Sequence, residues 1–132
     1  MRTPELLARR LASAAVSEMM LDCFLAMLDG YEDEEAIMRP EYFVAMVILE
    51  AEEILRLPPI NRTDIAKRLR TSRQNVSNWV VQLIDRGVVE ETASGGFIMR
   101  DDFFIKRHRA PYHKRMIEAI RRCFGKIEGY EP

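Results

Sequence analysis

The feature that most constrains the fold is a pair of short helical patterns between residues 61 and 86, joined by about three residues. Asn61 can cap the first helix with its side-chain oxygen. Thr71 and Gln74 are spaced as a capping box for the second helix, and Gly87 is placed to stop it. Two short helices joined in this way form the helix-turn-helix pattern.

The second helix of this pair carries two opposed faces. Apolar residues recur at spacings of three and four, which predicts one buried face: Val76, Trp79, Val80 and Leu83. Shifting that series back by two residues turns it by about 200° around the helix. The result is a mainly polar outward face: Gln74, Ser77, Asn78 and Val81. Ala66 in the first helix is small, as the crossing of two helices requires.

The outward face has the chemistry that reads base edges in a major groove. Gln74 and Asn78 can each bond two atoms of adenine. Ser77 suits a donor or an acceptor edge, and Val81 can contact a thymine methyl group. Arg73 can read guanine or hold a phosphate at the helix N-terminus. An ordinary solvated face would mix Glu and Lys, and this face has neither, so we expect double-stranded DNA as the partner.

Cations around the same helix are expected to contact phosphates, and binding should then weaken steeply with salt. We expect phosphate contacts from Arg62, Lys67, Arg68 and Arg70. The whole predicted DNA-binding set is Arg62, Lys67, Arg68, Arg70, Thr71, Ser72, Arg73, Gln74, Ser77, Asn78, Val81 and Arg100. We expect no catalytic residue, no cofactor and no metal ion.

A β-hairpin is predicted directly after the second helix. Residues 88–92 have strand character, residues 93–96 form a turn, and residues 97–100 form the second strand. A hairpin in this position is the wing of a winged helix-turn-helix. Its tip carries no charge, and the first basic residue after the turn is Arg100, so we do not expect the tip to enter a minor groove.

The first helix is expected from residue 5 to about residue 28, and its second half is apolar on nearly every side. A surface helix shows a single apolar stripe, so this one must be covered on two sides. We infer that a second subunit covers one of them; the alternative is burial within one subunit. A further helix should run from Pro40 to about Leu57, ended by two prolines, and a last helix should begin at about Tyr112.

These elements define a mainly α fold with a small β-hairpin wing. We divide the chain into an N-terminal dimerisation helix (1–30), a winged helix-turn-helix DNA-binding region (40–102) and a C-terminal dimerisation helix (103–132). We expect these parts to form a single compact domain overall.

The stretch from Thr71 to Glu91, TSRQNVSNWVVQLIDRGVVEE, resembles the recognition helix and following strand of the MarR family of bacterial regulators. The preceding PEYFVAMVILEAEEILRLPPINRTDIAKRL resembles the second and third helices of that family, and the long flanking helices resemble its dimerisation helices. The resemblance implies a homodimeric transcriptional regulator, often a repressor, sometimes released by a small ligand or by thiol oxidation.

Charge is distributed unevenly between the two halves. Residues 1–59 have 5 Lys/Arg against 12 Asp/Glu, a net −7, whereas residues 60–132 have 15 against 9, a net +6. An anionic partner therefore belongs to the second half. Acidic residues interrupt every long apolar stretch, so we expect neither a membrane span nor a secretory signal. We therefore expect the protein to be cytoplasmic. No phosphate loop or nucleophile elbow points to an enzyme.

Several alternatives stay open. The chain could be a winged-helix protein–protein interaction module that does not bind DNA. Cys23 and Cys123 could form a redox switch or be inert buried thiols. His108 and His113 do not share a helical face, which disfavours a metal site, and the acidic stretch of residues 30–39 suits a solvated loop. The basic run of residues 106–115 could contact phosphates or be a solvated surface, and the eight methionines suit an effector pocket or ordinary packing.

Overall fold

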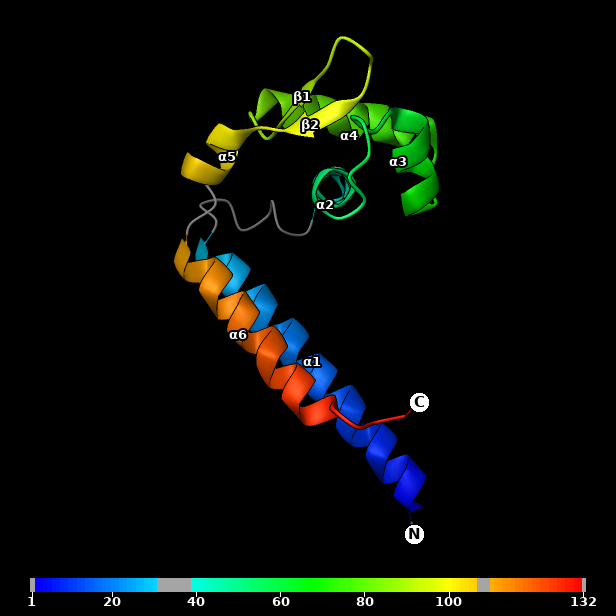
Figure 1. Ribbon diagram of the computed structural model, residues 1–132, viewed down its shortest axis with the longest axis vertical. Coiled ribbons are helices and arrows are strands. Elements are labelled where there is room, and N and C mark those ends of the chain that lie inside the picture. Colours follow the sequence, from blue (N-terminus) through cyan, green and yellow to red (C-terminus); the bar gives the residue numbers. More distant parts are fainter. Residues whose placement is uncertain (1, 31–38, 107–109, 132) are drawn as a thin grey trace. The chain divides into compact units, whose positions relative to one another are not determined.

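The computed structural model describes residues 2–30, 39–106 and 110–131, and it is mainly helical with one small antiparallel β-hairpin, as predicted (Figure 1). The chain divides into two compact units, one made of residues 1–32 and 108–132 and the other of residues 33–107. Residues 31–38 of the predicted acidic loop and His108 lie outside the described residues.

The first unit is a hairpin of two antiparallel helices, α1 (Pro4–Gly30) and α6 (Ala110–Ile127) (Figure 1). Their contact is made by small residues, which allow the two backbones to approach closely. The buried members of this contact are Ala15, Cys23, Ala26, Ala119 and Cys123. Helix α6 begins two residues earlier than predicted.

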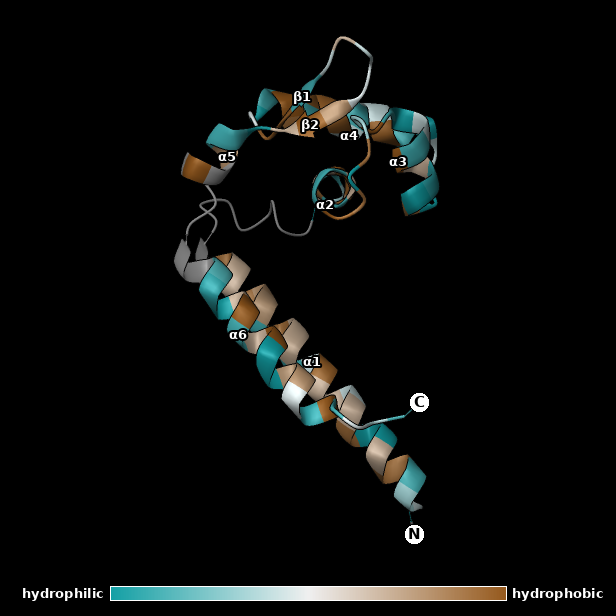
Figure 2. Ribbon diagram, in the orientation of Figure 1, coloured by the Kyte–Doolittle hydropathy of each residue, from teal (hydrophilic) through white to brown (hydrophobic). Residues whose placement is uncertain are grey.

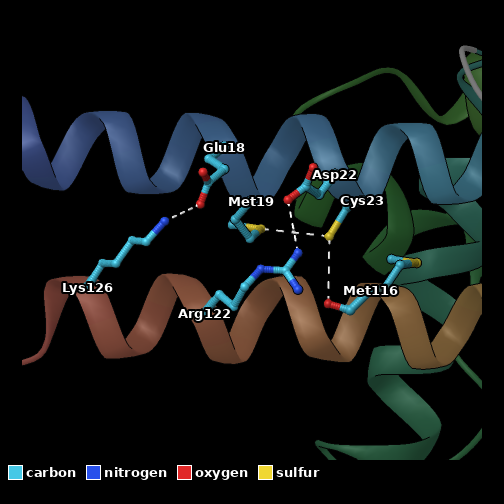
Figure 3. A network of polar contacts seen from close by, with 7 residues as sticks. All are labelled: Glu18, Met19, Asp22, Cys23, Met116, Arg122 and Lys126. Atoms are coloured by element: carbon cyan, nitrogen blue, oxygen red, sulfur yellow. Dashed lines mark hydrogen bonds and ion pairs between the residues drawn. The ribbon is translucent and has the colours of Figure 1, made fainter.

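Polar contacts fix the register of the hairpin (Figure 3). Arg122 donates to Asp22 at 3.0 Å, and Lys126 forms an ion pair with Glu18. Between these helices the Cys23 thiol lies 3.9 Å from the carbonyl oxygen of Met116. Acids of α1 therefore meet bases of α6 one turn apart, which holds the helices antiparallel.

Helix α1 is apolar along most of its length, and α6 leaves many of its large side chains exposed (Figure 2). Seven large apolar side chains of α1 are exposed: Leu6, Leu7, Leu11, Val16, Met20, Leu21 and Leu25. Within the described residues, only the stretch Pro4–Leu28 is long and apolar enough to cross a membrane, a test that core helices and N-terminal signal sequences also pass. Two helices alone leave this apolar surface open.

The second unit has a closed core built by helices α2 (Glu41–Glu53), α3 (Arg62–Leu69) and α4 (Arg73–Asp85) and strands β1 (Val89–Glu91) and β2 (Phe97–Met99). Its largest fully buried side chain is Phe97, which the helices and the hairpin enclose together. Apolar residues at helical spacing on α2 and α4 supply most of the rest, so the periodicity in the sequence did mark the core.

Helix α2 ends at Glu53, four residues before the predicted end at Leu57. The chain turns at Arg56, whose φ is +53°, and the Leu57 N–H donates back to the Ala51 carbonyl at 3.0 Å. The proline after Leu57 disfavours helical backbone at that residue, and the chain leaves the helix earlier to reach the next element.

At its other end, α2 begins with a buried acid, Glu41, whose side chain is 3% exposed. The Glu41 carboxylate lies 3.5 Å from the guanidinium of Arg86, the residue that caps the end of α4. Arg39 lies 3.9 Å away on the other side. This buried ion pair joins the start of α2 to the end of α4, and no local spacing of residues predicted it.

The connection between α3 and α4 is short and well capped. Asn61 accepts from the Asp64 N–H at 2.9 Å, which confirms the predicted cap of α3. Helix α3 ends at Leu69, and the residue that caps it, Arg70, adopts a left-handed conformation with φ of +54°. The predicted cap of α4 at Thr71 is wrong by one residue, because Ser72 accepts from the Asn75 N–H at 3.1 Å.

The hairpin pairs Val89 with Met99 and Glu91 with Phe97. Residue 60, just before α3, adds a bridge to the free edge of β2, where the Phe97 N–H donates to the Ile60 carbonyl at 2.9 Å. The turn packs so closely on residue 59 that a Cβ on Gly96 would lie 2.2 Å from the Pro59 carbonyl oxygen. A short helix, α5 (Asp101–Lys106), follows within the same unit. Residues 103–106, which the predicted division assigned to the C-terminal dimerisation helix, therefore belong to the second unit.

Candidate nucleic-acid interface

Helix α4 has the two opposed faces that its sequence predicts. Val76, Val80 and Leu83 are fully buried, and Trp79 is partly buried against the same core. On the outward face Gln74 and Asn78 are exposed, Val81 is 54% exposed and Ser77 is half-buried. The inward face thereby fixes the helix on the core, and the outward face keeps its polar groups in solvent.

The two amides of the outward face are joined. Gln74 Nε2 donates to Asn78 Oδ1 at 3.1 Å, a contact between residues one turn apart. This bond orients both side chains and leaves the Gln74 oxygen, one Gln74 N–H and both Asn78 N–H groups open. The pair thus presents donors and an acceptor side by side, the combination that adenine accepts in a major groove.

The N-terminus of α4 is held by its own side chains. Asn75 Nδ2 donates to Thr71 Oγ1 at 3.0 Å, and Ser72 caps the helix. Thr71 and Ser72, both predicted to contact DNA, thus serve first to fix the helix start. Arg73 is exposed, and no described side chain forms a hydrogen bond or an ion pair with it. It is therefore placed beside the positive end of the helix, where an anion is favoured.

Three of the predicted DNA-binding arginines are held by acids in the structure. Arg62 pairs with Glu91 at 2.9 Å and stacks over the ring of Phe97, with its guanidinium carbon 4.8 Å from the centroid. Arg68 makes two hydrogen bonds to the carboxylate of Glu50, at 2.9 and 3.0 Å. This hydrogen-bonded pair raises the pKa of Arg68 and lowers that of Glu50.

Arg100 is likewise paired, through two hydrogen bonds of 3.0 Å to the carboxylate of Asp102. That carboxylate raises the pKa of Arg100, first by hydrogen bonding and then by charge. Lys67 and Arg70, by contrast, make no side-chain ion pair with any described residue. The predicted cations therefore fall into two groups: Lys67, Arg70 and Arg73 are uncommitted, and Arg62, Arg68 and Arg100 would have to leave or share an acid.

The turn of the hairpin is compact and uncharged. The Thr92 hydroxyl donates to the Gly96 carbonyl at 3.1 Å and lies 2.9 Å from the Ser94 hydroxyl. The Thr92 N–H also donates to the Gly96 carbonyl, at 2.7 Å. These bonds use the polar groups of the turn within the turn itself, which agrees with a minor role for the tip in binding an anionic partner.

The acids that hold these arginines were not foreseen. Glu50 is 18 residues from Arg68 and Glu91 is 29 residues from Arg62, so no local spacing relates them. Asp102 lies two residues from Arg100, close enough for the sequence to have suggested the pair. The missed partners matter, because they set which cations are free.

The two cysteines are free and buried in the helical hairpin. Burial, and then the nearby charge of Asp22, raises the pKa of the Cys23 thiol. A raised pKa leaves less thiolate, the form that reacts with oxidants. The inert interpretation of Cys23 is therefore the better supported one.

A scan against protein-family models gives no match for this chain, and a search of curated proteins gives none either.

Proposed function

We propose that this chain is a double-stranded DNA-binding transcriptional regulator of the MarR type, built on a winged helix-turn-helix and acting as a homodimer. The observation that carries the proposal is the outward face of α4. It is largely exposed, has no acidic residue, carries paired amides at Gln74 and Asn78, and lies beside the uncommitted Arg73. A helix with this face is suited to a major groove.

The arrangement of elements supports the same proposal. In chain order the second unit has α2, the bridging residue Ile60, α3, α4, and then β1 and β2. This is the order of helices and strands in a winged helix-turn-helix, with α4 as the recognition helix and the hairpin as the wing. In that arrangement Arg73, Gln74, Ser77 and Asn78 read bases, and Lys67 and Arg70 contact phosphates.

The homodimer is supported by the apolar surface that the hairpin of α1 and α6 leaves exposed. Two recognition helices related by a two-fold axis would read two half-sites about one helical turn of DNA apart. Repression is the mode of regulation that the family resemblance implies, and a small-molecule effector remains an expectation of that resemblance.

The test begins with selection of bound fragments from random double-stranded DNA, followed by fluorescence anisotropy on the selected sequence at several salt concentrations. We expect a two-fold symmetric sequence and an affinity that falls steeply with salt. The combined substitution Arg73→Ala and Asn78→Ala should weaken binding by about tenfold to several hundredfold.

Arg121→Ala is the charge-matched control, because Arg121 is exposed on α6 and outside the proposed interface. It should leave the affinity unchanged. Binding without salt dependence, or equal affinity of the double variant and the wild type, would contradict the proposal. Failure to select any sequence would favour the protein–protein interaction module.

A further inference from the structure

Helix α1 carries a second apolar seam besides the face that packs on α6. We call it the leucine seam and define it by six residues spaced alternately by four and three: Leu7, Leu11, Ala14, Glu18, Leu21 and Leu25. An average spacing of 3.5 residues is the pattern by which helices pair along a continuous seam. Only one of the six positions is charged.

The structure leaves the leucine seam uncovered. Its leucines are 50%, 61%, 62% and 50% exposed, in chain order. Helix α6 packs instead on Ala15, Cys23 and Ala26, which are buried. At about 3.6 residues per turn these two sets lie roughly 100° apart around α1. One helix cannot cover both, so the leucine seam needs a second occupant.

The leucine seam is complementary to itself when two copies run antiparallel. In this register the numbers of two facing residues add up to 32. Leu7 of one copy therefore faces Leu25 of the second copy, and Leu11 faces Leu21. Ala14 then faces Glu18, so the smallest side chain of the leucine seam lies opposite its one polar side chain. Shifting this register by one heptad in one direction leaves two leucines without a partner. Shifting it by one heptad in the other direction places Glu18 opposite Leu21.

Charge favours the same arrangement. A parallel pair would place Glu18 opposite its own copy, which is repulsive. In the antiparallel register, Arg10 lies one turn before Ala14 and so comes beside Glu18 of the second copy. Arg10 is exposed, and no described residue pairs with it. Glu18 already meets Lys126 of its own chain (Figure 3), and a charge held in this way is poorly suited to lipid.

We propose that the occupant is a second copy of α1, antiparallel, with the two-fold axis level with residue 16. This inference rests on the homodimer of the proposed function and specifies its register. The interface consists of two layers of Leu7 with Leu25, two of Leu11 with Leu21, and two central layers in which Ala14 faces Glu18. The pairing of α1 with α6 within each copy is kept.

Cysteine cross-linking of the full chain tests the register. In a background with Cys23→Ala and Cys123→Ala, Leu11→Cys and Leu21→Cys are made singly and then mixed. Positions 11 and 21 face each other across the proposed interface, whereas two copies of position 11 lie about ten residues apart, roughly 15 Å along the axis. A disulfide needs Cα atoms within about 7 Å. Mild oxidation should therefore cross-link the mixture and neither single variant.

A charge pair gives a second test that does not depend on cross-linking. Leu11→Lys places a charge against Leu21 of the second copy and should raise the dimer dissociation constant at least tenfold in analytical ultracentrifugation. Ala14→Lys, three residues away, places its charge against Glu18 and should keep the dissociation constant within about threefold. Equal effects of the two substitutions would overturn the register.

The failures of the two proposals can be told apart. A dimer that cross-links equally well in the single variants overturns the register and keeps the homodimer. A chain that sediments as a monomer, or that floats with vesicles of neutral phospholipid through α1, overturns both. DNA affinity of the same variants, measured by anisotropy, reports on the recognition helix separately, because no seam residue belongs to α4.

Discussion

The two units of this chain solve the problem of burying apolar surface in different ways. The unit of residues 33–107 closes a core of its own, in which Phe97 and eight other large side chains are less than 2% exposed. The hairpin of α1 and α6 buries only small residues and leaves Leu21 62% exposed. Three helices and a hairpin of strands can surround a core, whereas two helices can share only a line of contact. The comparison teaches that the second unit closes its own core, whereas the hairpin of α1 and α6 leaves large apolar side chains uncovered.

The ion pairs of the two units also differ in which parts of the molecule they join. In the hairpin, Asp22 and Glu18 pair with α6 and fix its register. In the other unit, Glu50 and Glu91 hold arginines beside the proposed DNA-binding helix. Pairs of the first kind support the fold, and those of the second kind would compete with the proposed nucleic-acid partner.

The largest effect should come from the closed core. Phe97→Ala removes its largest buried side chain and should lower the free energy of unfolding of this unit by about 3–5 kcal/mol. Trp79 is the only tryptophan, so its fluorescence in urea reports this unit alone. Ile105→Ala, at a residue 81% exposed, is the control and should change stability by less than about 0.5 kcal/mol. Loss of the hairpin helices in the same transition, followed by circular dichroism, would break the comparison.

A smaller effect is expected from crowding the hairpin. Ala119 is 1% exposed, and Ala119→Leu should force α1 and α6 apart at a cost of about 1–3 kcal/mol. The helical signal should melt earlier while Trp79 fluorescence keeps its midpoint. Arg121→Leu adds the same side chain at an exposed position of α6 and should not lower the melting temperature. If Arg121→Leu lowers the melting temperature as much as Ala119→Leu does, the tight contact between the helices is not the cause.

The competing ion pairs give a modest effect on binding. Glu50→Gln releases Arg68 from its bidentate carboxylate and should raise affinity for the selected DNA by about twofold to fivefold, since exposed charges interact weakly. Glu53→Gln removes an exposed acid that makes no contact with Arg68 and serves as the matched control. An equal gain in both variants would mean that only the net charge matters.

The smallest effect concerns pH. Burial raises the pKa of Glu52, whose carboxylate accepts from the Met99 N–H at 2.8 Å. A raised folded pKa means that the folded state binds the proton more tightly. The contribution of Glu52 to stability is therefore complete below the ordinary Glu pKa of about 4.3 and is lost as the pH rises through the raised value. Glu52→Gln keeps the acceptor and should flatten this loss, as seen in urea midpoints between pH 4 and pH 7.

Glu50 supplies the control of opposite sign. Hydrogen bonds from Arg68 lower its pKa, so its contribution is present above the ordinary Glu pKa and is lost as the pH falls through the lowered value. Glu50→Gln should therefore flatten the decline on the acid side instead. Identical pH profiles for wild type and both variants would show that neither carboxylate is coupled to folding.

Much of the second unit followed from its sequence because its signals are local. The cap at Asn61 and the apolar spacing of α4 fix where helices begin and which face is buried, and both need only a few neighbouring residues. The end of α2 was misplaced by four residues, because the turn at Arg56 depends on where the chain must go next. The cap of α4 was misplaced by one, since Thr71 and Ser72 are both good caps and the sequence does not choose between them.

The sequence by itself determined helices α1 to α4 and α6, the hairpin of strands and the two faces of α4, because helical period, capping and turn residues act over short distances. Only the tertiary structure decided which arginines beside α4 are held by acids, and that Glu41 is buried against Arg86. Those pairs join residues far apart in the chain, and a charge meets its partner only after packing has brought the two elements together. The apolar excess of α1 belongs to both levels: the sequence placed it there, and the packing of α6 on a single face left the leucine seam open.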